Sequence, residues 1–282
     1  MKTGFIGNGR ICRAFSEYIE RRGTEVIGKF GKRELYSDYS RGEVDVKSLI
    51  GLIQSCDLLF ITTPDDTIRE IAAILAATGA DMSCKLLVHM SGSLESREMD
   101  AMQGRCAGLY SLHPMTSITG EPLDFSQVHL TLEGSGTDAA EAAMREFLQA
   151  MDLHYTRISG AHKLLYHAAS CISANYTVTL VDIAQKIYSD IGFDKVTVQA
   201  LLLPLMRQVI ENIAEKGTEK ALTGPVSRGD TGTIRKHLAA LGEYGRYEDV
   251  YRLVGRYTAN LSEDAGNISA PCAQQIRTLM EG

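Results

Sequence analysis

The first half of the chain alternates short apolar runs with amphipathic segments. The apolar runs have the length of β-strands, and apolar positions between them recur at helical spacing. The predicted strands are 3–6, 25–30, 58–62, 86–90, 129–132 and 154–158, and the predicted helices are 11–22, 68–77, 96–102 and 138–150. Strands and helices that alternate in this way predict right-handed crossovers and a doubly wound, mostly parallel sheet of the α/β class.

The second half contains only helical patterns. Ser159 has the side chain of a helix N-cap, and 161–191 contains neither glycine nor proline. About 30 residues at 1.5 Å each would form a helix roughly 45 Å long. Further helical patterns cover 196–216, 233–241, 247–262 and 271–280, with a glycine-rich loop at 223–230. We therefore predict two domains, an α/β domain at 1–158 and an all-helical domain at 159–282.

Composition limits the classes of partner. The 282 residues carry 29 Lys and Arg against 35 Asp and Glu, a formal charge of −6, with no dense cationic tract. This charge argues against nucleic acid or an anionic membrane surface as the main partner. The first residues lack the apolar core of a signal peptide, and the longest apolar runs fall far short of the ~20 residues that span a bilayer. We expect a soluble, cytoplasmic protein.

The six cysteines are scattered along the chain. None of them forms a C-x-x-C pair or has the spacing of metal ligands. Several lie in apolar runs, as buried thiols do in proteins of reducing compartments. We expect reduced cysteines and no metal site.

A glycine turn follows the first predicted strand and opens the first predicted helix. In the sequence Gly7-Asn8-Gly9-Arg10-Ile11-Cys12, the first glycine permits a tight turn and the second lets the backbone approach a pyrophosphate. The helix N-terminus supplies N–H groups for the phosphates. Cys12 stands where the motif has Gly or Ala. The turn predicts a dinucleotide site whose contacts include Gly7, Asn8, Gly9, Arg10 and Ile11.

The end of the second predicted strand indicates which nicotinamide cofactor binds. NAD enzymes carry an acid there for the ribose 2′-hydroxyl, whereas 28–33 reads Gly-Lys-Phe-Gly-Lys-Arg. Lys32 and Arg33, with Arg10, have the charge to neutralise a 2′-phosphate. We therefore expect NADP(H) rather than NAD; the alternative is a solvated basic turn.

Two further loops follow predicted strands at the edge where such sheets bind ligands. Thr62, Thr63 and Pro64 follow one strand, and Ser91 follows the next. Both loops are expected to line the nicotinamide side of the cleft, and Ser91 also to contact substrate. A simple turn that caps the next helix is the alternative for the first loop.

Three segments carry groups suited to proton transfer or substrate binding beside a nicotinamide. His113 lies in a predicted loop at 111–116. Lys163 and His167 are four residues apart and share a helix face, so each should lower the pKa of the other, and Asn175 lies two turns further on. Arg228 and Asp230 lie in the glycine-rich loop. Each segment has a simpler alternative. His113 could be a structural histidine, Lys163 and His167 a surface lysine above a core histidine, and the glycine-rich loop an exposed turn.

Four motifs together resemble one superfamily of dehydrogenases. They are 7–10 (Gly-Asn-Gly-Arg), 111–115 (Ser-Leu-His-Pro-Met), Lys163-x-x-x-His167 with Asn175, and Gly-Pro-x-x-Arg-Gly-Asp at 224–230. The superfamily includes 6-phosphogluconate dehydrogenase, β-hydroxyacid dehydrogenases, ketopantoate reductase and pyrroline-5-carboxylate reductase. Within it the chain is most similar to a family of NADP oxidoreductases with a helical C-terminal domain of unknown function.

This resemblance implies a Rossmann NADP-binding domain followed by an all-helical substrate domain that forms a homodimer. It also implies proton transfer by the residue at Lys163, while His167 stands where several members have a substrate-binding Asn. The leading hypothesis is an NADP-dependent oxidoreductase that acts on a small carbonyl or imine, or on the corresponding alcohol or amine. Lys163 or His167 is expected to exchange the proton, and His113 to donate a proton or to hold the substrate. Asn175, Arg228 and Asp230 are assigned to the substrate. The alternatives are a catalytically silent NADP-sensing protein and a deazaflavin-linked NADP oxidoreductase.

Overall fold

A computed structural model describes residues 1–281, and by internal contacts the chain divides into two compact units. The first unit runs from Met1 to Tyr176 and the second begins at Thr177. The change from mixed to purely helical structure comes earlier, after the last strand ends at Arg157. The helix that follows this strand thus belongs by its contacts to the first unit. The domain boundary at Ile158 stays a prediction.

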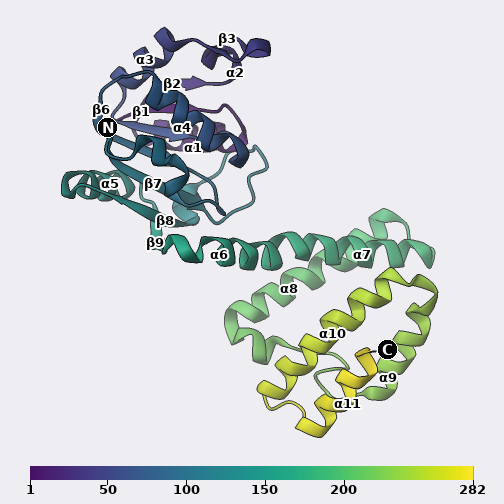
Figure 1. The fold of residues 1–282 in the computed structure, drawn as a ribbon. Coiled ribbons are helices and arrows are strands. Elements are labelled where there is room, and N and C mark those ends of the chain that lie inside the picture. Colours follow the sequence, from purple (N-terminus) through teal and green to yellow (C-terminus); the bar gives the residue numbers. More distant parts are fainter. Residues whose placement is uncertain (282) are drawn as a thin grey trace. The chain divides into compact units, whose positions relative to one another are not determined.

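The first unit is built on a seven-stranded sheet in the order β2-β1-β5-β6-β7-β8-β9 (Figure 1). β1, β2, β5, β6 and β7 are parallel, β8 is antiparallel to β7, and β9 is parallel to β8. The strands are β1 (Lys2–Ile6), β2 (Glu25–Phe30), β5 (Leu58–Ile61), β6 (Met82–His89), β7 (Cys106–Pro114), β8 (His129–Gly136) and β9 (His154–Arg157). A separate antiparallel pair is formed by β3 (Tyr36–Asp38) and β4 (Glu43–Val44).

Helices of the first unit cover both faces of this sheet. They are α1 (Arg10–Arg21), α2 (Lys32–Leu35), α3 (Val46–Ser55), α4 (Ile68–Ala77), α5 (Asp138–Ala150) and α6 (Lys163–Ser170), with a 3-10 helix at Ser96–Met102. Successive side chains of a strand point to opposite faces, so Phe5 packs with α1 and α5, while Ile6 packs with α3 and α4. Both faces of the central strands are therefore buried, as in other parallel sheets.

One strand of the sheet was not predicted. The segment 111–116 was expected to be a loop, but Ser111, His113 and Pro114 lie in β7 between β6 and β8. This prediction was wrong because Gly108, Ser111 and His113 interrupt the apolar pattern. Hydrogen bonds from both neighbouring strands compensate for the weak local pattern. The consequence is that His113 lies at the carboxyl end of a central strand.

The second unit consists of helices. They are α7 (Tyr176–Asp190), α8 (Lys195–Ala221), α9 (Thr231–Leu241), α10 (Arg246–Asp264) and α11 (Ala270–Glu281), and Figure 1 shows the last two side by side. Their core contains Ile234, Ala259 and Ile276. The Met280 side chain of α11 packs over Gly255 of α10, where a β-carbon would lie 2.6 Å from the Met280 Cε atom. Among the described residues, no helix has the length and apolar character needed to cross a membrane.

Candidate functional site

The glycine turn between β1 and α1 fits against the end of β5. Gly7 has φ +105°, and a β-carbon there would lie 2.5 Å from the backbone carbon of Thr62. The Gly7 amide donates to Phe30 O at 2.7 Å, and Thr62 Oγ1 donates to Gly7 O at 2.8 Å. Only glycine allows this approach, so the first glycine is required by the protein itself.

The second glycine has no such steric requirement. A β-carbon at Gly9 would meet nothing closer than Thr62 O at 3.9 Å, although Gly9 is the N-cap of α1. The first turn of α1 has no side-chain cap and no acidic residue. Its N–H groups and the positive end of the helix dipole are therefore available to an anion. This open space above uncapped amides fits the pyrophosphate of a dinucleotide.

The turn opens into a cleft of about 740 Å³. Seven of the residues predicted to contact cofactor line it, namely Gly7, Asn8, Gly9, Lys32, Thr62, Thr63 and Pro64. Arg10, Ile11, Arg33 and Ser91 lie outside this lining in the part of the chain that is described. The Arg10 side chain extends toward Gly120, Ile11 packs against the core, and Arg33 is exposed.

Lys163 lies at the beginning of α6 and is completely buried, with a relative exposure of 0%. Its Nζ donates to Ser91 O at 3.1 Å and to Ser111 Oγ at 2.5 Å, so it joins α6 to the ends of β6 and β7. Burial lowers the pKa of Lys163 to about 8, while Glu133, Asp65 and Glu95 act in the opposite direction. A lysine with this pKa exchanges its proton near neutral pH.

Two histidines meet beside Lys163 at Gly92. A β-carbon at Gly92 would lie 2.7 Å from His113 Nε2 and 2.7 Å from His167 Cδ2, so a larger residue would displace both rings. A 2.9 Å hydrogen bond joins His113 Nδ1 to the hydroxyl of Tyr166. Burial, followed by the charge of Lys163, lowers the pKa of His113 to about 4. His113 is therefore a neutral imidazole at physiological pH.

Sequence reasoning missed the residues that hold this group in place. The Asp65 carboxylate accepts hydrogen bonds from Ser91 Oγ at 2.7 Å and Ser93 Oγ at 3.0 Å. The Ser91 amide donates to His89 Nδ1, so the proton of His89 is on Nε2, which donates to Glu95 O. A signal was available for Asp65, because it follows a strand that ends at the ligand-binding edge.

Three other predicted site residues lie elsewhere along the chain. Asn175 is exposed in the π-helical turn Cys171–Asn175. Arg228 is exposed in the second unit, and Asp230 caps α9 by accepting hydrogen bonds from Thr233 N and Oγ1. These hydrogen bonds lower the pKa of Asp230. The substrate roles of Asn175, Arg228 and Asp230 stay predictions.

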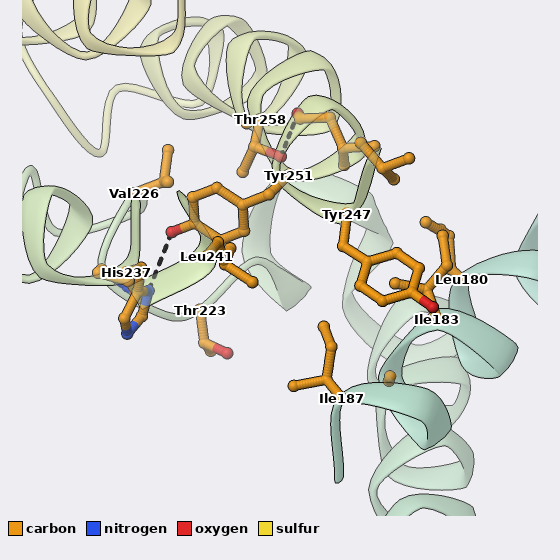
Figure 2. A pocket seen from close by; sticks show the side chains of 15 residues that line it. Leu180, Ile183, Ile187, Thr223, Val226, His237, Leu241, Tyr247, Tyr251 and Thr258 are labelled. Atoms are coloured by element: carbon orange, nitrogen blue, oxygen red, sulfur yellow. Dashed lines mark hydrogen bonds between the residues drawn. The ribbon is translucent and has the colours of Figure 1, made fainter. Parts of the chain in front are cut away.

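The second unit has a cleft of its own, of about 370 Å³, between α7, α9 and α10 (Figure 2). Its walls are mostly apolar, with Leu180, Ile183 and Ile187 on α7. Figure 2 shows the Tyr251 hydroxyl pointing toward His237, and the two are joined by a 3.0 Å hydrogen bond. The pair satisfies its own polar groups, so this cleft offers shape and apolar surface rather than acid–base chemistry. The described residues contain no cluster of three or more side chains suited to a metal ion.

Comparison with protein families finds a match over residues 128–258 to the Domain of unknown function (DUF2520). No curated protein matches the sequence. Several solved structures resemble nearly the whole chain. One, from Bacteroides fragilis and named as a proposed NADP oxidoreductase, is 18% identical, with a TM-score of 0.70 over 93% of this chain and 98% of its own.

Two other similar structures contain the cofactor. Pyrroline carboxylate reductase from Plasmodium falciparum, with NADP bound, is 12% identical, with a TM-score of 0.56 over 100% of this chain and 98% of its own. A reductive aminase from Aspergillus terreus, in complex with NADPH and ethyl-5-oxohexanoate, is 14% identical, with a TM-score of 0.59 over 99% of this chain and 92% of its own. The likeness confirms the predicted fold class, a Rossmann-type sheet followed by a helical region.

The lowered pKa of Lys163 makes a testable contribution to stability. Lysine titrates near 10.5 when unfolded and near 8 in the folded protein, so the unfolded state binds more protons between these values. The stability of the wild type should therefore rise with pH across this window relative to Lys163→Met, by roughly 3 kcal/mol in total. Urea unfolding of both proteins from pH 8 to 10.5 measures the difference; parallel curves would contradict the assignment.

Proposed function

We propose that this protein is an NADP(H)-dependent oxidoreductase that acts on a small carbonyl or imine, or on the corresponding alcohol or amine. The observation that carries the proposal is the order of groups along one edge of the sheet. The glycine turn follows β1, Thr62 and Thr63 follow β5, and Ser91 and His113 lie at the ends of β6 and β7. Strands are about 4.8 Å apart, so the turn and Ser91 are separated by roughly 10 Å, within the length of a dinucleotide.

The nucleotide is assigned to the cleft at the glycine turn. Gly9 and the uncapped N–H groups of α1 would hold the pyrophosphate, and Thr62 and Thr63 would lie along the bound cofactor. When bound there, NADPH supplies a hydride. The similar structures that contain NADP or NADPH support this choice of cofactor.

The proton chemistry is assigned to His113, Lys163 and His167. His113 is half-buried and neutral, so its ring can hold a substrate oxygen or nitrogen through a hydrogen bond. Lys163 has no exposed surface, and two of its three protons are already donated to Ser91 O and Ser111 Oγ. This favours His113 as the group that contacts substrate. Burial and the charge of Lys163 keep that imidazole neutral, and the His167 ring lies beside it.

The second glycine provides a test of the nucleotide site. Gly9→Ala has room in the folded protein and should fold with a small loss of stability, because alanine is a poorer helix N-cap than glycine, but its methyl group would stand where the pyrophosphate approaches. We expect the Kd for NADPH, measured by nucleotide fluorescence, to rise at least tenfold. Gly51→Ala, where a β-carbon also meets nothing within 4 Å, is the matched control and should bind like the wild type. Equal binding by both variants would contradict the assignment.

His113 provides a test of the chemistry. NADPH consumption is measured with a panel of 2-oxo acids, ketones and cyclic imines. His113→Gln should lower kcat by about 100-fold, because the positioned imidazole is lost, with the Kd for NADPH within twofold of the wild type. His154→Gln, on an exposed strand end, is the control. NADPH binding without turnover of any compound by the wild type would favour the silent sensing protein instead.

We also propose that the protein is a homodimer through its helical region. In α8 only Val198 and Leu202 are buried, whereas seven other large apolar side chains are at least 40% exposed, namely Val196, Leu201, Leu203, Leu205, Val209, Ile210 and Ile213. Exposed apolar side chains in this number on one helix are typical of a surface that a partner covers. A second copy of the chain offers the same apolar surface in a self-complementary form.

A measurement of the oligomeric state tests whether the exposed apolar side chains of α8 form the dimer interface. Leu203→Glu combined with Ile210→Glu places two charges on the exposed face of α8 and should convert a dimer into a monomer. Light scattering after size exclusion gives the mass. Gln208→Glu adds a charge at an exposed polar position of the same helix and should leave the dimer intact. A monomeric wild type would contradict the proposal.

A further inference from the structure

The imidazole ring of His113 is hydrogen-bonded at only one of its two nitrogens. Its Nδ1 lies 2.9 Å from the hydroxyl oxygen of Tyr166, which belongs to the first turn of α6. Its Nε2 faces the space in front of Gly92, where a β-carbon would lie 2.7 Å away. Among the described residues 1–281, no group is hydrogen-bonded to Nε2. The contact with Tyr166 therefore decides which nitrogen of the ring carries the proton.

Two arrangements of protons fit the contact between His113 and Tyr166. A neutral imidazole has one N–H group and one lone pair, and a phenol has one O–H group. Either the Tyr166 hydroxyl donates to Nδ1, or Nδ1 donates to the hydroxyl and the phenol proton turns to Met115 Sδ at 3.8 Å. A thioether is a weak acceptor, whereas the lone pair of an imidazole is basic. The arrangement in which Tyr166 donates to Nδ1 is therefore favoured.

This arrangement leaves the N–H group of His113 at Nε2. Burial, followed by the charge of Lys163, lowers the pKa of His113 to about 4, so the neutral ring has no second N–H group. Burial also raises the pKa of Tyr166, so the phenol keeps the proton that it donates. The nitrogen on the open side of the ring is thus a hydrogen-bond donor and not a base.

We propose that Tyr166 is a positioning residue, which fixes the tautomer of His113 that presents Nε2–H to the substrate. The proposal rests on the proposed function, because it takes His113 as the group that contacts substrate. A donor at Nε2 requires a lone pair on the substrate, such as that of a carbonyl oxygen or of the nitrogen in an uncharged imine. A quaternary iminium ion has no lone pair, and the charge of Lys163 repels it. The site should therefore accept carbonyls and uncharged imines and exclude permanently charged iminium ions.

Nitrogen NMR of the protein carrying isotope-labelled histidine measures the tautomer without nucleotide or turnover. The signals of His113 are those that His113→Gln lacks. At neutral pH we expect a protonated Nε2 and an unprotonated Nδ1 in the wild type. Tyr166→Phe keeps the aromatic ring and removes only the hydroxyl, so both tautomers of His113 should become populated. A proton on Nδ1 in the wild type, or an unchanged tautomer in folded Tyr166→Phe, would overturn the role of Tyr166 and leave the proposed function standing.

The second unit provides a matched control. The Tyr251 hydroxyl lies 3.0 Å from Nδ1 of His237, so Tyr251→Phe removes an equivalent hydrogen bond from a histidine outside the site. This variant should change the nitrogen signals of His237 and leave those of His113 as in the wild type. An equal change at His113 in Tyr251→Phe would also overturn the role of Tyr166.

Turnover of NADPH tests the consequence for the substrate. Tyr166→Phe should lower kcat for ketones and 2-oxo acids about tenfold, the effect of one lost hydrogen bond, and leave the Kd for NADPH unchanged. The wild type should not reduce the N-methylpyrrolinium ion. Reduction of this ion as fast as a ketone would overturn the exclusion of charged iminium ions. A folded wild type that binds no NADPH would overturn the proposed function and the substrate class with it, while the NMR result still decides the role of Tyr166.

Discussion

The buried ammonium of Lys163 is the contact on which the geometry of the candidate site depends. It binds Ser91 O and Ser111 Oγ, and so holds the start of α6 against the ends of two neighbouring strands. A cation without water is tolerated only where hydrogen bonds and opposite charges replace its hydration, here with Glu133 and Asp65 nearby. Burial lowers the pKa of His113 and so keeps it neutral, and the charge of Lys163 adds to this effect. One side chain thus fixes the start of a helix and contributes to the protonation state of the ring beside it.

The glycines of the first unit show two different constraints. Gly7 and Gly92 are required by the protein, since a β-carbon would collide with the Thr62 backbone in one case and with two histidine rings in the other. Gly9 has free space around it, so no steric contact among the described residues requires a glycine there. Gly9 leaves open space above the uncapped amides of α1. Such an arrangement is typical of sites where a phosphate group approaches a helix N-terminus.

Net charge gives little information about such a site. The chain carries −6 overall, yet Lys163 is buried beside His113, while the Glu34 carboxylate is bound to the Gly31 amide. The sign of the local charge therefore differs from one part of the first unit to another. Coulomb interactions weaken with distance and are screened by salt, so a ligand responds to these neighbours rather than to the total.

The sequence by itself determined the alternation of strands and helices, the glycine turn and the change to helices. It could do so because an element that is buried on one face has apolar residues at a regular spacing along the chain. It did not reveal β7, whose stability comes from two neighbouring strands. Only the tertiary structure brought Lys163 to Ser91 and Ser111, which are 72 and 52 residues away in the chain. Strand order and side-chain direction decide these contacts, and no local pattern encodes either.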